Sequence, residues 1–163
     1  MDTIGPQILL QVFLIALNAF FAATEIAVIS LNAAKLRKMM EDGDKKAGRM
    51  LKMVEEPSGF LSTIQIGITL AGFLGSAFAA ENFSDPLVQW ITQDLGFTAI
   101  STSTLNTLSV VLITIVLSYF TLIFGELVPK RIAMQKPMAV AKIACGVIRA
   151  IATVMRPVIW FLS

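Results

Sequence analysis

The sequence predicts an all-α integral membrane protein with three transmembrane helices, a helical hairpin on the cytoplasmic side and a C-terminal amphipathic juxtamembrane helix. Three observations lead to this prediction. Hydrophobic residues make up 56% of the 163 residues and charged residues only 15%, whereas soluble domains carry about 25% charged residues. Three apolar runs are each long enough to cross a bilayer as a helix, which takes roughly 20 residues. All 13 Lys and Arg fall outside these runs, in residues 35–52 and 130–156.

The single transmembrane domain is expected to cover residues 1–163, with spans at about 7–31, 60–80 and 105–128. Residues 32–57, after the first span, combine seven basic and five acidic residues with helical spacing of their apolar positions. That composition predicts an amphipathic hairpin at a membrane surface. Because cytoplasmic segments of membrane proteins carry the excess of Lys and Arg, we expect the hairpin and the C-terminus to face the cytoplasm and the N-terminus to lie outside. The expected location is the plasma (inner) membrane.

The segment after the third span is apolar but carries cations at a regular interval. Lys142, Arg149 and Arg156 recur every seven residues, which places them on one face of a helix. This spacing predicts an amphipathic helix over residues 137–156 that lies along the membrane. A fourth spanning helix is the alternative.

The strongest candidate site is Gly125-Glu126-Leu127-Val128-Pro129-Lys130, at the end of the third run. A carboxylate at membrane depth is costly and usually functional, which directs attention to Glu126. Pro129 has no N–H, so it breaks the helix pattern and leaves the carbonyl of Gly125 without its helical partner. Two hard oxygen donors side by side predict a cation site. The alternative is that Glu126 lies at the interface and pairs with Lys130, one turn beyond.

The first span offers further oxygen donors. Asn18, Ala22 and Glu25 share one helical face, and Thr24 lies about 100° round the helix from Glu25. Glu25 has the same alternative as Glu126, namely an ion pair with a lysine at the interface. Its contribution to a cation site is therefore open at this point.

The second span carries two patterns on different faces. Small residues recur every four positions, at Gly67, Ala71, Gly75 and Ala79. Such a ridge predicts close helix packing, within one chain or between two. Polar residues alternate by three and four on another face, at Ser62, Gln65, Thr69, Gly72 and Ser76. They either line a polar cavity or form hydrogen bonds with neighbouring helices.

The residue types limit the chemistry. The spans offer carboxylate, hydroxyl, amide and carbonyl oxygens, and the chain has no His and one Cys. This donor set suits Mg²⁺, Ca²⁺ or Na⁺ and disfavours zinc and copper. No nucleophile-plus-base arrangement and no phosphate-binding glycine loop is present, so we expect neither an enzyme nor a nucleic-acid-binding protein.

Three segments carry a resemblance to a known family. FFAATEIAVISL in the first span, LSTIQIGITLAG in the second and FGELVPKRIA after the third resemble the transmembrane domain of the CorC/CNNM (cyclin M) family, which includes bacterial hemolysin-like proteins with CBS domains. The resemblance implies a homodimeric magnesium transporter that exports Mg²⁺, with sodium coupling. It also implies a following pair of cytoplasmic CBS modules that bind ATP and a small C-terminal domain, both absent from this sequence.

The resemblance also implies which residues hold the metal. By motif these are Thr24, Glu25, Gly67, Thr69, Gly125 and Glu126, with Asn18 and Gln65 as secondary candidates. Many family members have serine in place of Ala22 and asparagine at the Ile68-Thr69 pair. A second hypothesis is a membrane anchor and sensor that transports nothing and signals to the CBS modules. A cavity that reaches Glu126 favours transport, whereas an ion pair that seals Glu126 favours the anchor.

Overall fold

The computed structural model of the chain describes residues 4–96 and 99–162, and this part is helical apart from short connections. No strand occurs among the described residues, so the all-α prediction is confirmed. Two π-helical segments, η1 and η2, continue the helices that precede them. In chain order the elements are α1 (Ile4–Ile29), α2 (Ala33–Glu41), α3 (Lys45–Glu55), α4 (Pro57–Gln89), η1 (Trp90–Asp94), α5 (Thr102–Leu122), η2 (Ile123–Leu127), α6 (Val128–Gln135) and α7 (Pro137–Leu162).

Among the described residues, three helices are long and apolar enough to cross a membrane, as predicted. They are α1 with 26 residues, α4 continued by η1 with 38 residues, and α5 continued by η2 and α6 with 34 residues. The second helix runs well past the expected span of residues 60–80. It ends beside Gly96, whose φ of 64° lies in the left-handed region that favours glycine. Between Ser76 and Leu95 the sequence contains no glycine that would end the helix earlier.

The hairpin of α2 and α3 is fixed by side-chain caps at its two helix starts. The Asn32 carboxamide oxygen accepts hydrogen bonds from two backbone N–H groups of α2, and the Asp44 carboxylate does the same for α3. Each cap satisfies N–H groups that have no partner within the helix. Gly43, with a φ of 98°, makes the turn between the two helices.

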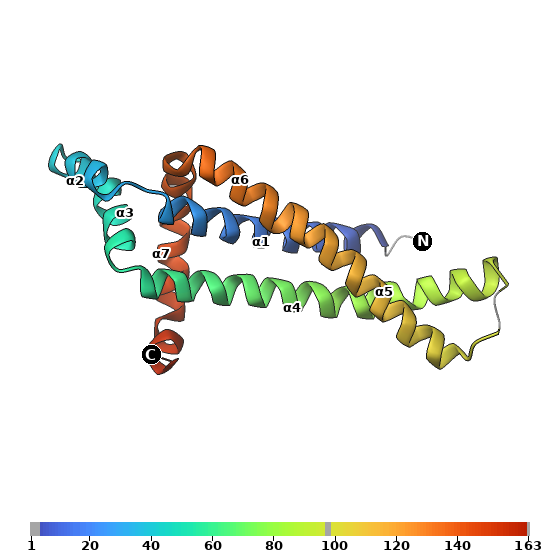
Figure 1. Cartoon of the computed structure of the whole chain (residues 1–163). Helices are drawn as coiled ribbons and strands as arrows, with labels where there is room; N and C mark the ends of the chain where they lie inside the picture. Colours follow the sequence, from blue (N-terminus) through green and yellow to red (C-terminus); the bar gives the residue numbers. More distant parts are fainter. Residues whose placement is uncertain (1–3, 97–98, 163) are drawn as a thin grey trace.

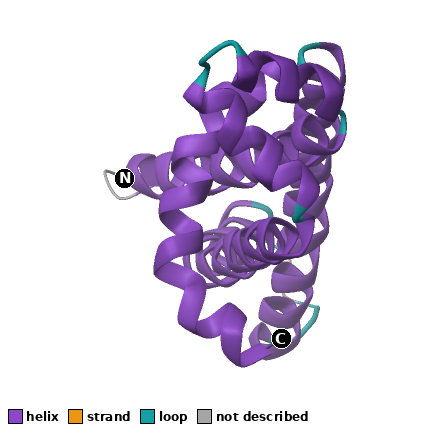
Figure 2. Ribbon diagram, turned by 90° about the vertical axis from the view of Figure 1, so that its left-hand side faces the viewer, coloured by secondary structure: helices purple, strands orange, loops and turns teal. Residues whose placement is uncertain are grey.

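Helix α7 runs across the ends of α1 and α4 rather than along them (Figures 1 and 2). Its two parts, Pro137–Ile151 and Thr153–Leu162, are bent by 52° relative to each other. Pro157 contributes to such a bend because it has no N–H to donate to the carbonyl of Thr153. By length and composition the two parts together could also form a broken fourth span, so the helix along the membrane surface stays a prediction.

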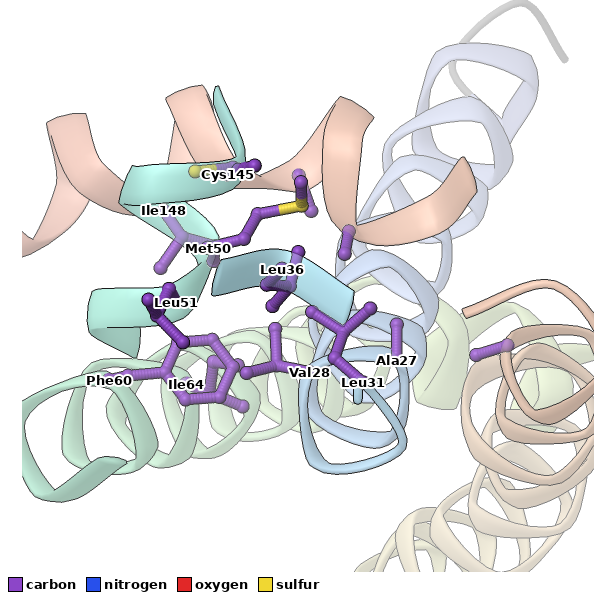
Figure 3. Packing of buried hydrophobic residues seen from close by; sticks show 14 of the residues in the cluster. Ala27, Val28, Leu31, Leu36, Met50, Leu51, Phe60, Ile64, Cys145 and Ile148 are labelled. Atoms are coloured by element: carbon purple, nitrogen blue, oxygen red, sulfur yellow. The ribbon is translucent and has the colours of Figure 1, made fainter. Parts of the chain in front are cut away.

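The buried core lies at the hairpin end of the molecule. Leu36 of α2, Met50 of α3, Ile64 of α4 and Ile148 of α7 are almost completely buried there (Figure 3). The core thus ties the hairpin and α7 to the ends of the spans. In contrast, only 11% of the most apolar window of the third long helix is buried. That helix leaves an apolar surface for lipid or for another protein.

Candidate cation site

The site begins at η2, where the third long helix widens into a π-helical turn. The N–H of Val128 donates to the carbonyl of Ile123, five residues back instead of four. Such single π turns inside α-helices occur frequently at functional sites. The turn comes directly before Pro129, at the place where the sequence predicts a break in the hydrogen-bond pattern.

The carbonyl of Gly125 accepts a hydrogen bond from a side chain of another helix. The Asn18 carboxamide nitrogen donates to it over 3.1 Å, and both residues are buried. A Cβ atom added at Gly125 would lie 2.9 Å from that nitrogen, so glycine allows the approach. Asn18 thus gives the Gly125 carbonyl a partner and connects α1 to η2. A carbonyl oxygen has a second lone pair, so the contact does not exclude a further donor or cation.

A cavity of about 500 Å³ opens beside this contact, between α1, α4 and the α5–η2 helix. Glu126 contributes the one ionisable side chain among the described residues that line it. The remaining lining is aliphatic or aromatic apart from small and neutral polar residues. The polar side chains are Gln11, Asn18, Thr69, Ser76, Ser118, Thr121 and Glu126.

The polar face of the second span turns partly toward this cavity. Thr69, Gly72 and Ser76 line it, whereas Ser62 and Gln65 do not. The Gln65 carboxamide donates to the Thr69 hydroxyl over 3.4 Å, which connects one of the secondary candidates to the lining. The second half of this polar face therefore lines a cavity, which is one of the two roles that the sequence left open.

The small-residue ridge of the second span packs against α1 of the same chain. A Cβ atom at Gly67 would lie 2.7 Å from the ring of Phe21, and one at Gly75 would lie 3.2 Å from the Gln11 carboxamide. Ala71 and Ala79, the other members of the ridge, are buried. The ridge allows α1 and α4 to approach closely, and two of its members, Ala71 and Gly75, line the cavity.

Two candidates from the first span lie away from the cavity. The carboxylate of Glu25 is 3.8 Å from the ammonium group of Lys130, and both side chains are partly exposed. The Thr24 hydroxyl donates to the carbonyl of Phe20 over 2.7 Å and is fully buried. Neither side chain is part of the cavity lining. Within the described part of the chain, Glu126 forms no ion pair, because Lys130 pairs with Glu25 instead.

Gln11 is a polar residue of the site that the sequence analysis did not single out. It is 8% exposed, it lines the cavity, and its carboxamide oxygen has no hydrogen-bond partner among the described residues. Gln11 lies seven residues before Asn18, so the two amides share one face of an apolar helix. This seven-residue spacing of two amides in an apolar helix was the sequence signal that could have pointed to Gln11.

The site does not contain a cluster of acids. No group of three or more His, Cys, Asp or Glu that could hold a metal occurs within the described residues. A cation in the cavity would therefore be held by one carboxylate together with neutral oxygens. Donors of this kind suit hard cations that keep part of their hydration shell.

Comparisons with known proteins find similarity over almost the whole chain. The profile of the Cyclin M transmembrane N-terminal domain matches residues 9–163. A UPF0053 protein of Synechocystis sp. is 36% identical over 92% of the chain and 33% of its own length. A polyamine export protein of Salmonella typhimurium is 31% identical over 92% of the chain and 32% of its own length. The UPF0053 inner membrane protein YfjD of Escherichia coli is 26% identical over 90% of the chain and 30% of its own length.

The chain thus spans about a third of the length of these curated relatives. None of the three carries the name of an enzyme.

Proposed function

The chain belongs to the family of Cyclin M transmembrane N-terminal domains, a family of membrane transporters, and we propose that it carries a cation across the membrane through the Glu126 cavity. The observation that supports this most is the position of Glu126. Glu126 lines a cavity of about 500 Å³, while the nearby Lys130 pairs with Glu25. An ionisable group inside a span raises the free energy of the protein in the membrane and usually has a function. A membrane anchor that transports nothing would not require such a group beside a cavity.

The proposed cation is Mg²⁺, and the proposed direction is export. The lining supplies one carboxylate, two amides and several hydroxyls, all of them oxygen donors that Mg²⁺ accepts. Mg²⁺ gives up its waters reluctantly and usually keeps several of them in proteins. A cavity of this size has room for an ion with bound water. Glu126 would supply charge, and Thr69, Asn18 and Gln11 would bind the ion or its waters.

A polyamine is the second candidate, and the cavity itself favours it. A volume of about 500 Å³ exceeds what one metal ion requires, and most of the lining is apolar. An extended organic cation combines ammonium groups with methylene segments, which fit a carboxylate beside apolar walls. The Salmonella relative is named a polyamine export protein.

Several further features belong to the same proposal. The hairpin and α7 would face the cytoplasm, with the N-terminus outside, in the plasma membrane. Two chains would form a homodimer, with the exposed apolar surface of the third long helix facing either the second chain or lipid. CBS modules that bind ATP would follow this domain in the longer protein, and Na⁺ would be the coupling ion.

Calorimetric titration of the purified chain with MgCl₂ and with spermidine tests this proposal. Glu126→Gln removes the carboxylate with little change in size, and Glu81→Gln is the matched control on an exposed part of α4. We expect Glu126→Gln to weaken binding of the preferred cation about tenfold or more, a change of about 1.4 kcal/mol in binding free energy. Glu81→Gln should bind like the wild type. Unchanged binding in Glu126→Gln would refute the assignment of Glu126 as a ligand.

A further inference from the structure

A second, larger cavity lies at the hairpin end and shares no lining residue with the Glu126 cavity. It has a volume of about 970 Å³ and is bounded by α3, the start of α4 and α7. Basic residues dominate its charged lining, and Glu56 is the one acidic residue among the described residues of that lining. The basic residues are Lys45, Arg49, Lys52, Arg149 and Arg156.

Two of these cations converge from different helices. Arg49 comes from α3 and Arg149 from α7, and both line the cavity together with Cys145 of α7. Burial raises the pKa of the Cys145 thiol, and the two guanidinium groups act in the opposite direction. Within the described part of the chain, neither guanidinium forms an ion pair or a side-chain hydrogen bond. The cavity therefore presents positive charge that the described protein does not neutralise.

The same cavity has an apolar side. Met53, Phe60 and Ile148 line it next to the basic residues, and Phe60 and Ile148 belong to the buried core. A site for a fully hydrated anion would not need such a wall. A molecule that carries a negative group and a hydrocarbon part would contact both kinds of surface.

The position of the cavity relative to the spans indicates where such a molecule would come from. Helix α7 crosses the ends of α1 and α4 (Figure 1), and it leaves Ile143, Val147 and Val154 exposed. In a membrane protein, an amphipathic helix with this course lies at the boundary between head groups and acyl chains. If α7 lies along the membrane surface as proposed, the basic cavity between α3 and α7 is at the level of the lipid phosphates.

We infer that this cavity binds the head group of an anionic phospholipid. Arg49 and Arg149 would donate paired hydrogen bonds to the phosphate oxygens, a geometry for which guanidinium groups are well suited. Lys45, Lys52 and Arg156 would add long-range attraction to an anionic leaflet. The first part of an acyl chain would lie on the wall of Met53 and Phe60. A bound lipid would connect the hairpin to α7, and this inference does not depend on which cation the Glu126 cavity binds.

Native mass spectrometry of the chain, released from nanodiscs of equal parts phosphatidylglycerol and phosphatidylcholine, tests the inference. The wild type should retain more phosphatidylglycerol than phosphatidylcholine. Because the two guanidinium groups would bind the phosphate directly, Arg49→Gln/Arg149→Gln should reduce this retention about 20-fold. The matched control is Lys35→Gln/Lys38→Gln, which removes two exposed charges from α2 outside the cavity. It should retain the lipid within about twofold of the wild type.

Three outcomes would overturn the inference. One is equal retention of the two lipids by the wild type, and another is the same loss in the cavity variant and in the control. The third is displacement of the retained phosphatidylglycerol by excess inorganic phosphate, which would indicate a site for a small anion without a hydrocarbon part. Because Arg49 and Arg149 are exposed, their double variant should fold. If its thermal unfolding shows otherwise, Lys45→Gln/Lys52→Gln on the same cavity replaces it, with the same expected direction and the same refutation.

Discussion

The carboxamide of Asn18 donates a hydrogen bond to the carbonyl of Gly125 across 107 positions of sequence. The bond joins the first long helix to the π-helical turn of the third, beside the Pro129 position that disturbs the helical pattern. Asn18 and Glu126, the neighbour of Gly125, both line the same cavity. One contact therefore supports the helix break and orders the wall of the proposed cation site.

Removal of this contact should destabilise the domain. Asn18→Ala leaves the buried Gly125 carbonyl without its side-chain partner, which should lower the free energy of unfolding by about 1–2 kcal/mol. Asn106→Ala, at an exposed position of α5, is the control and should have little effect. Thermal unfolding in detergent measures both. Equal unfolding temperatures for the two variants would show that the contact does not stabilise the fold.

A methyl group at Gly67 should separate α1 from α4. The added Cβ would lie 2.7 Å from the Phe21 ring, and such overpacking typically costs about 1–3 kcal/mol. Gly72→Ala is a matched control on the same helix, because its Cβ would meet nothing within 4 Å. We expect a lower unfolding temperature for Gly67→Ala alone. If Gly72→Ala is equally destabilised, helix packing at Gly67 is not the cause.

Glu25 and Glu126 should respond differently to the same substitution. The Glu25–Lys130 pair is 3.8 Å long and partly exposed, and pairs of this kind contribute about 1 kcal/mol or less. Glu25→Gln should therefore lower the unfolding temperature slightly and leave cation affinity within about twofold, because Glu25 does not line the cavity. A loss of affinity in Glu25→Gln as large as that in Glu126→Gln would place Glu25 in the ion site.

Cys145 should react slowly with a water-soluble maleimide at neutral pH. The thiol is 5% exposed, and burial raises its pKa. The thiolate is the form that reacts with maleimide. Because its pKa is raised, Cys145 should reach its full reaction rate only at a higher pH than an ordinary cysteine. Ser58→Cys in a Cys145→Ala background provides an exposed reference at the same end of the molecule. Equal rates for the two thiols at neutral pH would contradict the buried position of Cys145.

The sequence was sufficient to predict the elements whose signals are local. Apolar runs identified the three long helices, and the spacing of apolar and charged residues identified the two helices of the hairpin. Pro129 identified the carbonyl of Gly125 as one that needs another partner. Each of these predictions depends on residues within a few turns of one another, where helix geometry fixes the spacing.

The pairings between helices could not be predicted in the same way. Lys130 lies one turn from Glu126 in sequence, yet it pairs with Glu25 of another helix. A lysine side chain reaches several positions, and only the packing of α1 against α6 decides between its partners. The same limitation applies to Asn18, whose partner is 107 residues away. The assignment of Thr24, Glu25, Gly67, Thr69, Gly125 and Glu126 as metal ligands stays a prediction.

The most direct test of the proposed transport is cation flux in liposomes that contain the chain. A dye inside the vesicles reports Mg²⁺, and radiolabelled spermidine reports polyamine movement in a parallel series. We expect the wild type and Glu81→Gln to carry the cation at similar rates, and Glu126→Gln to fall to the rate of vesicles without protein. Flux in Glu126→Gln equal to that of the wild type would contradict the account, since transport would then not pass through the Glu126 cavity.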